Sequence, residues 1–357
     1  MEAEIVQFVA GEESPSSSAR LPLGPVVAVL AAVLVIAIVL AITCGAVRIP
    51  LESIEACFLH SRPLAPDQQT ILLDVRLPRI VAAAMVGASL SLAGLLFQGL
   101  FRNPLADPYV IGSSGGAVLG ASVGMVLLPQ VSWMGFSAIA LLAFAGSVAT
   151  IAIVYSLARV GGTTQVVTLL LAGFAVSTML SYSSYFVEIL DRDYGMGLRV
   201  LASWLHGSIG VPRWTQVGVV GLLLLIALPA SAVLARRLNT LALGDEYAQQ
   251  LGVKVESVRI AIIIVGSLFA AVAVSLGGLI GFVGLIVPHL ARLVMGPDHL
   301  RLLPVTALTG AAFLVLTDTL ARTVMAPSEL PVGILMALIG GPFFLYLLRR
   351  TKRGYGA

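Results

Sequence analysis

Few side chains in this sequence could carry chemistry, and their spacing excludes common metal and nucleotide sites. The four histidines, His60, His206, His289 and His299, have no spacing typical of a zinc site. The chain has no H-E-x-x-H motif and no G-x-x-x-x-G-K-[ST] phosphate loop. We therefore predict that the chain is not an enzyme, binds no cofactor or metal, and cannot hydrolyse ATP by a phosphate loop.

The polar segment "LNTLALGDEYAQQLGV", residues 238–253, interrupts long apolar runs. Asn239 can cap a first short turn, and Gly244 can end it in a left-handed conformation. Asp245 can then cap a second turn that ends at Gly252. The segment is thus predicted to form two short helices joined at a glycine corner.

This segment has two possible roles. An amphipathic helix lying on lipid headgroups usually carries Lys and Arg on its polar face, but none occurs between Arg237 and Lys254. Leu241, Tyr247 and Leu251 would provide an apolar side. We favour docking on another protein over anchoring at the membrane surface.

Three arginines and one aspartate are unusual for their predicted positions at the outer ends of apolar segments. Asp318 would cost roughly 2.5–3.5 kcal/mol at bilayer depth, so it is expected to pair with Arg322 or to face water. Arg76, Arg79 and Arg322 could extend to headgroups. They could equally form a receptor for an acidic partner.

Other polar or helix-breaking residues are predicted to shape the structure. In "RNPLADPYVIGSSGGAVLG", the pairs Asn103-Pro104 and Asp107-Pro108 predict a tight, bent connection. Pro288 falls within a short apolar segment. A later segment is rich in hydroxyls that could bond their own helix or line a passage for a bulky ligand; the candidates are Ser177, Ser181, Ser184 and Tyr185.

The composition identifies the class of protein that must position these residues. Of the 357 residues, 58% are hydrophobic and 11% are charged, and the mean hydropathy is +1.01. Too few polar side chains exist to cover a water-facing surface. We predict an all-α polytopic membrane protein, with a tail at 1–21, a membrane domain at 22–350 and a second tail at 351–357.

Apolar runs separated by charges, Gly and Pro predict ten membrane-spanning helices. Their expected ranges are 24–46, 79–101, 109–129, 135–158, 165–187, 214–235, 257–278, 280–296, 303–323 and 331–348. Lys and Arg favour the side that holds both termini, which predicts that this side is cytoplasmic. "SLAGL" at Ser91 and "SLGGL" at Ser275 suggest an inverted internal repeat.

Several long stretches resemble the permease subunits of ATP-binding-cassette (ABC) importers for ferric siderophores, haem and vitamin B12, the FecCD type. The matching stretches include "RLPRIVAAAMVGASLSLAGLLFQGLFRNPLADPYVIGSSGGA", "LASWLHGSI", "LNTLALGDEYAQQLGVKVESVR", "GLIGFVGLIVPHLARLVMGPDHLRLLP" and "GAAFLVLTDTLAR". They cover nearly the whole chain after residue 70. No motif among them distinguishes the cargoes, so haem, corrinoid and siderophore all remain open.

The resemblance implies the type II importer permease fold. It also implies three kinds of partner: a second permease, expected to be a copy of this chain, two cytoplasmic ATPase subunits holding ATP and Mg²⁺, and a substrate-binding protein. It implies that Arg76, Arg79 and Arg322 dock the binding protein, and that serines of the fifth span line the path. It also implies residues that couple to the ATPase. These are Asn239, Leu241, Leu243, Gly244, Asp245, Glu246, Ala248, Leu251 and Gly252. The implied location is a bacterial or archaeal cytoplasmic membrane; an ion-coupled secondary transporter is the alternative.

Overall fold

The computed structural model describes residues 21–45, 65–109, 111–160, 163–190, 201–326 and 328–353, and this part of the chain is largely helical. The first half contains α2 (Leu23–Thr43), α4 (Pro66–Thr70), the π-helical η1 (Ile71–Arg76), α5 (Leu77–Phe101), α6 (Ser113–Leu127), α7 (Ala138–Ala158) and α8 (Val166–Ile189). The second half contains α10 (Trp214–Leu241), α11 (Asp245–Gln250), α12 (Val255–Gly277), α13 (Val283–Met295), α14 (His299–Thr323) and α15 (Val332–Arg353).

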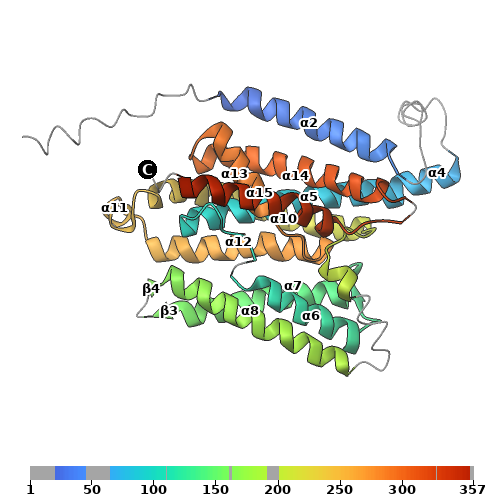
Figure 1. Cartoon of the computed structure of the whole chain (residues 1–357), viewed down its shortest axis with the longest axis horizontal. Coiled ribbons are helices and arrows are strands. Elements are labelled where there is room, and N and C mark those ends of the chain that lie inside the picture. The colour runs from blue at the N-terminus through green and yellow to red at the C-terminus, as the bar shows by residue number, and fades with distance from the viewer. Residues whose placement is uncertain are drawn as a thin grey trace, which may run out of the picture.

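Two short antiparallel hairpins join helices. The first pairs β1 (Ser132–Trp133) with β2 (Phe136–Ser137), and the second pairs β3 (Arg159–Val160) with β4 (Thr163–Thr164). The second hairpin lies at the same end of the bundle as α11, whereas α4 lies at the opposite end (Figure 1). The helices run roughly along the line between these two ends.

Seven described helices are long and apolar enough to cross a membrane, and three shorter apolar helices, at Ser113–Leu127, Val283–Met295 and Val332–Leu347, accompany them. All ten predicted ranges therefore overlap an apolar helix. Two of these helices extend furthest beyond their predicted ranges. The helix predicted at 79–101 continues from Pro66 to Phe101, and that predicted at 214–235 continues to Leu241.

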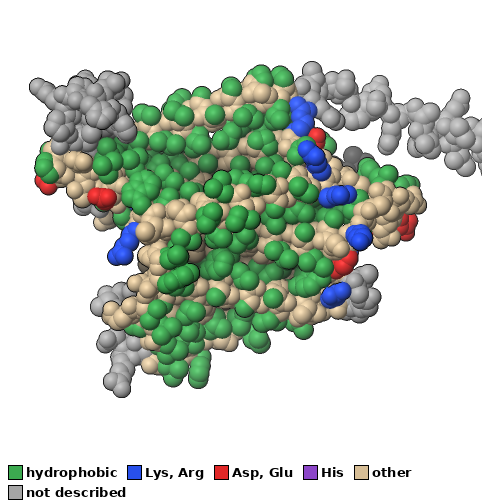
Figure 2. Space-filling view, turned by 180° about the vertical axis from the view of Figure 1, so that it is seen from behind, with side chains coloured by type: hydrophobic (Ala, Val, Ile, Leu, Met, Phe, Trp, Pro, Cys, Tyr) green, Lys and Arg blue, Asp and Glu red, His purple; other side chains and the backbone are tan. Residues whose placement is uncertain are grey.

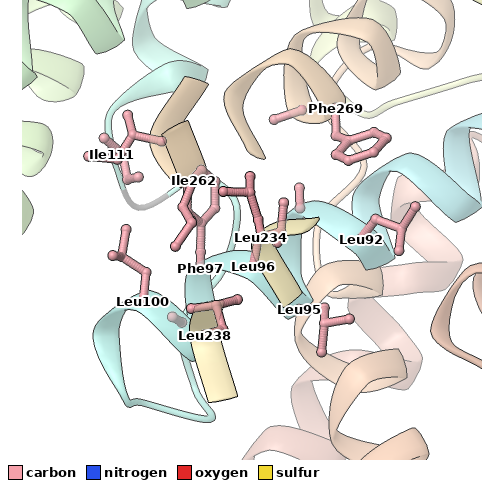
Figure 3. Packing of buried hydrophobic residues seen from close by; sticks show 14 of the residues in the cluster. Leu92, Leu95, Leu96, Phe97, Leu100, Ile111, Leu234, Leu238, Ile262 and Phe269 are labelled. Atoms are coloured by element: carbon pink, nitrogen blue, oxygen red, sulfur yellow. The ribbon is translucent and has the colours of Figure 1, made fainter. Parts of the chain in front are cut away.

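Helix α5 is the centre of the bundle. Its side chains are mostly buried, and it packs against α10, α12, α13 and α14. Figure 3 shows Phe97 and Leu96 of α5 among Leu234 and Leu238 of α10 and Ile262 of α12. The sequence around this core is apolar on all sides because α5 is surrounded by other helices rather than by solvent.

Glycines allow helices to approach closely at several crossings. A Cβ atom at Gly94 would lie 1.9 Å from the carbonyl oxygen of Gly284, where α5 meets α13. A Cβ at Gly115 would lie 2.4 Å from the carbonyl oxygen of Ser177 on α8, and one at Gly116 would lie 2.2 Å from that of Gly146 on α7. The small residues of "GSSGGA" therefore serve close packing of α6.

Apolar side chains cover the flank of the bundle, and charged side chains gather toward its two ends (Figure 2). In this view Lys and Arg are more numerous at the end that carries α11. Such a distribution suits a bundle whose flank lies in hydrocarbon and whose ends reach water.

The two stretches that suggest an internal repeat differ in their local structure. Ser91 lies within α5, whereas Ser275 lies in the last turn of α12. Pro104 lies in the connection after α5, but Pro288 lies inside α13. The two matching stretches thus occupy different positions relative to the ends of their helices.

Candidate functional site

The polar segment forms one short helix rather than two. Helix α10 runs without interruption to Leu241, so the predicted separate first turn is the end of α10. At 28 residues α10 is about 42 Å long, which exceeds the roughly 30 Å of hydrocarbon. Its last turns and α11 therefore project beyond the apolar flank, at one end of the bundle (Figure 1).

A glycine lies on each side of α11, as the sequence predicts. Gly244 has φ 117° and precedes the helix, and Gly252 has φ 78° and follows it. Asp245 is the first residue of α11, not its cap, and no side chain caps this helix. The left-handed region explains the two glycines, since other residues rarely adopt it.

The apolar side chains of the segment divide between two faces. Leu241 and Ala248 are buried against the bundle. Leu243, Tyr247 and Leu251 are 65%, 65% and 66% exposed, respectively, and with Gln250 they line a shallow hollow. Large apolar side chains exposed together beyond the flank are typical of a protein-docking surface. We call these three side chains the apolar tip.

Asn239 faces the bundle, so the prediction that it caps a short turn is wrong. Its Nδ2 donates to Asp298 Oδ1 at 2.7 Å, and its Oδ1 accepts from the backbone N–H of His299 at 2.9 Å. Asn239 therefore ties the end of α10 to the start of α14. Burial opposes ionisation of Asp298, but the hydrogen bonds from Asn239 and from backbone N–H groups outweigh it, so the pKa of Asp298 is lowered.

Asp245 lies between two arginines from other helices. Arg102 Nη2 lies 2.7 Å from Asp245 Oδ1 and also donates to the carbonyl oxygen of Leu241 at 2.6 Å. Arg259 of α12 pairs with Asp245 Oδ2. Sequence reasoning assigned only a capping role to Asp245. It missed these partners because they lie 143 positions before Asp245 and 14 positions after it.

The Arg259 side chain continues the polar network. It donates to the carbonyl oxygen of Thr164 in β4 at 3.1 Å and lies 3.9 Å from the carboxylate of Glu256. Glu256 accepts from the backbone N–H of Thr164 at 3.2 Å and from the hydroxyl of Tyr155 on α7 at 3.3 Å. Charged and hydroxyl groups thus join α5, α7, α11 and α12 at this end.

The three arginines predicted for the outer side, which we call the outer arginine cluster, are buried in the subunit. Arg76, Arg79 and Arg322 are 4%, 5% and 7% exposed. Arg79 Nη2 lies 3.0 Å from Asp318 Oδ1, and Arg322 Nε lies 3.0 Å from Asp318 Oδ2. The predicted pairing of Asp318 with Arg322 is confirmed, while Arg79 is a partner that the sequence did not reveal.

A further carboxylate reaches Arg79 from the connection between α14 and α15. Glu329 Oε2 lies 2.8 Å from Arg79 Nη1, and the Glu329 side chain is 50% exposed. Arg79 therefore bridges a buried and a half-exposed carboxylate.

The candidate path residues on α8 have different surroundings. Ser177 accepts from the backbone N–H of Gly115 at 3.0 Å and so faces α6. Ser184 is 1% exposed and donates to the carbonyl oxygen of Ser181 in its own helix at 2.7 Å. Ser184 does not line an open passage in this subunit, because it is buried. The path role of Ser177, which is half-buried, stays a prediction. Tyr185 is exposed beside Tyr182.

The expected bent connection after α5 is stabilised by its own side chains. Asn103 Oδ1 accepts from the N–H of Leu105, and Asp107 Oδ1 accepts from the N–H of Tyr109, both at 2.9 Å. Pro108 packs on α13, since a Cβ at Gly284 would lie 2.5 Å from its Cγ.

Gln98 of α5 compensates for Pro288 inside α13. Pro288 has no N–H to donate to the carbonyl oxygen of Gly284, four residues earlier. Gln98 Nε2 donates to that oxygen at 3.1 Å, and Gln98 Oε1 accepts from Arg292 at 3.2 Å. Sequence reasoning missed Gln98, because only the fold brings it to Pro288.

Several known proteins are similar to this chain in sequence, and a solved structure is similar to it in fold. A cobalamin import system permease protein of Halobacterium salinarum is 48% identical, over 79% of this chain and 74% of the relative. A hemin transport system permease protein of Yersinia pestis is 41% identical, over 79% of this chain and 84% of the relative. A solved structure described as an inward-facing putative metal-chelate type ABC transporter has a TM-score of 0.79 and 31% identity, covering 91% of this chain and 99% of that one.

The match to a family description covers most of the membrane domain. Residues 33–350 match the FecCD transport family, and this range includes the second half of α2, all helices from α4 to α14, most of α15 and the outer arginine cluster. The expected resemblance is thereby confirmed. This chain belongs to the FecCD transport family.

Proposed function

We propose that this chain is the membrane-spanning permease subunit of an ABC importer. It would receive a metal chelate of the iron-siderophore, haem or cobalamin type from a substrate-binding protein and pass it into the cytoplasm. Membership of the FecCD transport family and the named relatives support the import role. The observation that carries the coupling role is the exposed apolar tip of α11, beyond the end of the apolar flank.

The proposal assigns the energy source to other subunits. Two ATPase subunits with ATP and Mg²⁺ would bind below the apolar tip, because Leu243, Tyr247 and Leu251 are apolar side chains exposed together, as at protein interaction sites. This chain would bind no nucleotide, cofactor or metal itself. A second permease copy would complete the path, in a bacterial or archaeal cytoplasmic membrane with both termini in the cytoplasm.

The substrate-binding protein would dock at the opposite end of the bundle, near the outer arginine cluster. Arg79 is neutralised on its exposed side by Glu329. Direct contact with an acidic partner would therefore replace Glu329 by a carboxylate of that partner. Arg76 and Arg322 would act on the partner from beneath the surface, since both are buried.

An ion-coupled secondary transporter would need a carboxylate that binds and releases a cation within the membrane. Asp318 is occupied by two arginines. Glu188 of α8 is a second intramembrane carboxylate, 1% exposed, that accepts from Ser122 at 3.3 Å. The two arginines paired with Asp318 favour the ABC importer, whereas Glu188, with one hydrogen-bond donor among the described residues, does not discriminate between the two functions.

The test is co-purification of the ATPase subunit with permease variants. Leu251→Asp places a charge in the apolar tip, and we expect it to weaken ATPase binding by on the order of 2 kcal/mol, or about thirtyfold. The matched control is Gln249→Asp, which adds the same charge to an exposed position of α11 outside the tip. Full co-purification with Leu251→Asp would contradict docking through this tip.

A further inference from the structure

The contacts of Asp245 suggest a role different from that of the apolar tip. Its two oxygens each reach a different arginine, Arg102 and Arg259. One arginine follows the last residue of α5, and the other lies in the second turn of α12. Asp245 therefore joins α11 to two helices that are distant from each other in sequence.

Backbone geometry indicates that Arg102 is held in place for this contact. Arg102 has φ 49°, in the left-handed region that favours glycine. A glycine there would satisfy the backbone but could not reach Asp245. The guanidinium instead contacts both the carbonyl oxygen of Leu241, before α11, and the carboxylate of Asp245, within it.

The network around Asp245 is less exposed than the surface that an ATPase would contact. The side chains of Arg259, Asp245 and Arg102 are 17%, 37% and 48% exposed, respectively, all less than the 65–66% of the three residues of the apolar tip. The carboxylate is directed toward Arg102 and Arg259, with which it surrounds a small cavity that also borders Leu100, Phe101 and Val166. The network thus lies behind α11, between it and the membrane helices.

Together these observations define a mechanical connection. We propose that Asp245 is a positioning residue that fastens the ATPase-facing helix α11 to α5 and α12 through Arg102 and Arg259, so that displacement of α11 moves the membrane helices. This inference rests on the proposed function. It differs from the sequence expectation, in which Asp245 caps the second turn of the coupling segment, because Asp245 would transmit motion through its two arginines. Helix α5 is the element best placed to pass motion on, because it packs against α10, α12, α13 and α14.

The connection can be broken with little change in shape. Asp245→Asn keeps the size of the side chain but removes the charge that both arginines require. The complete complex of permease and ATPase subunits is reconstituted in lipid vesicles. A spin label at Val324→Cys, an exposed position just after α14, reports the response of the opposite end to ATP and Mg²⁺. Native Cys44 and Cys57 are first replaced by Ser in all variants.

We expect Asp245→Asn to co-purify with the ATPase like the parent protein, because the apolar tip is unchanged. The spectral response at Val324→Cys, per ATP hydrolysed, should fall by roughly fivefold or more. Arg102→Gln should cause a smaller loss, because the ion pair of Arg259 with Asp245 remains. The double variant Asp245→Asn/Arg102→Gln should be no worse than Asp245→Asn alone, since Asp245→Asn already removes the ion pair with Arg102. Asp245→Glu should restore part of the response.

The control Gln249→Ala alters an exposed side chain of the same helix and should respond like the parent. A parental response in Asp245→Asn would overturn the proposal. Loss of co-purification in Asp245→Asn would also overturn it, by making Asp245 a docking residue. A failure of the proposed function is distinguishable, because the parent permease itself would then not bind the ATPase.

Discussion

At the residue scale, the cluster around Asp318 shows how a buried charge is tolerated. The carboxylate is 1% exposed, and its ion pairs with Arg79 and Arg322 are both 3.0 Å long. Burying a charge is costly unless a partner compensates it. Arg322 is four residues from Asp318, so helical spacing alone predicts that pair. Arg79 is 239 positions away in the sequence, and only the packing of α5 against α14 brings it there.

This cluster leads to a stability prediction. Asp318→Asn leaves two buried arginines without their shared counterion, and we expect it to lower the free energy of unfolding by about 3–5 kcal/mol. Thermal unfolding of the purified permease in detergent measures the effect. Glu329→Gln is the matched control, because it removes the half-exposed partner of Arg79 and should cost about 1 kcal/mol or less. Equal effects of the two substitutions would show that burial of Asp318 does not matter.

At the element scale, α13 illustrates how one helix completes another. It has only 13 residues, contains Pro288, and is preceded by Phe282 at φ 68°. A 13-residue helix is about 20 Å long and cannot cross the hydrocarbon by itself. The close approach of Gly94 to Gly284 places Gln98 where the missing hydrogen bond of α13 must be supplied.

A double-mutant cycle tests this compensation. Gln98→Leu leaves the buried carbonyl oxygen of Gly284 without its donor, and we expect a loss of about 1–3 kcal/mol in the free energy of unfolding. In a Pro288→Ala background the helix can supply its own N–H to Gly284. The cost of Gln98→Leu should therefore be smaller there, by roughly 1 kcal/mol. Equal costs in the two backgrounds would refute compensation of Pro288 by Gln98.

At the scale of the whole molecule, the two ends of the bundle have different chemistry. One end carries α11 with the apolar tip, and the other carries η1 and the buried arginine cluster. The hairpin β1–β2 joins the far ends of α6 and α7, whereas β3–β4 joins the ends of α7 and α8 beside α12. An importer that receives cargo on one side and ATP-driven motion on the other requires such a difference.

Labelling in intact cells tests the orientation. Native Cys44 and Cys57 are replaced by Ser, and single cysteines are introduced as Tyr247→Cys in the apolar tip and Trp133→Cys in β1, both at exposed positions. A membrane-impermeant maleimide should label Trp133→Cys in intact spheroplasts, and Tyr247→Cys only after permeabilisation. The reverse pattern would place α11 outside the cell and exclude coupling to a cytoplasmic ATPase.

The sequence by itself determined the class of protein, the approximate positions of the apolar helices and the two glycines that lie on either side of α11. These features depend on local properties, namely hydropathy over a helix length and the conformational freedom of single residues. The family stretches further predicted a FecCD-type permease, which the match over residues 33–350 confirms.

Only the tertiary structure decided which polar groups meet. Asn239 and Asp245 look like helix caps in the sequence, yet both face the bundle, one toward Asp298 and the other toward Arg102 and Arg259. Ser184 looks available for a passage but bonds its own helix. The directions of Asn239 and Asp245 depend on partners that lie far away along the chain, and local sequence does not reveal these partners. In an apolar bundle such partners matter, because burying a polar group without a partner is costly and water cannot provide one.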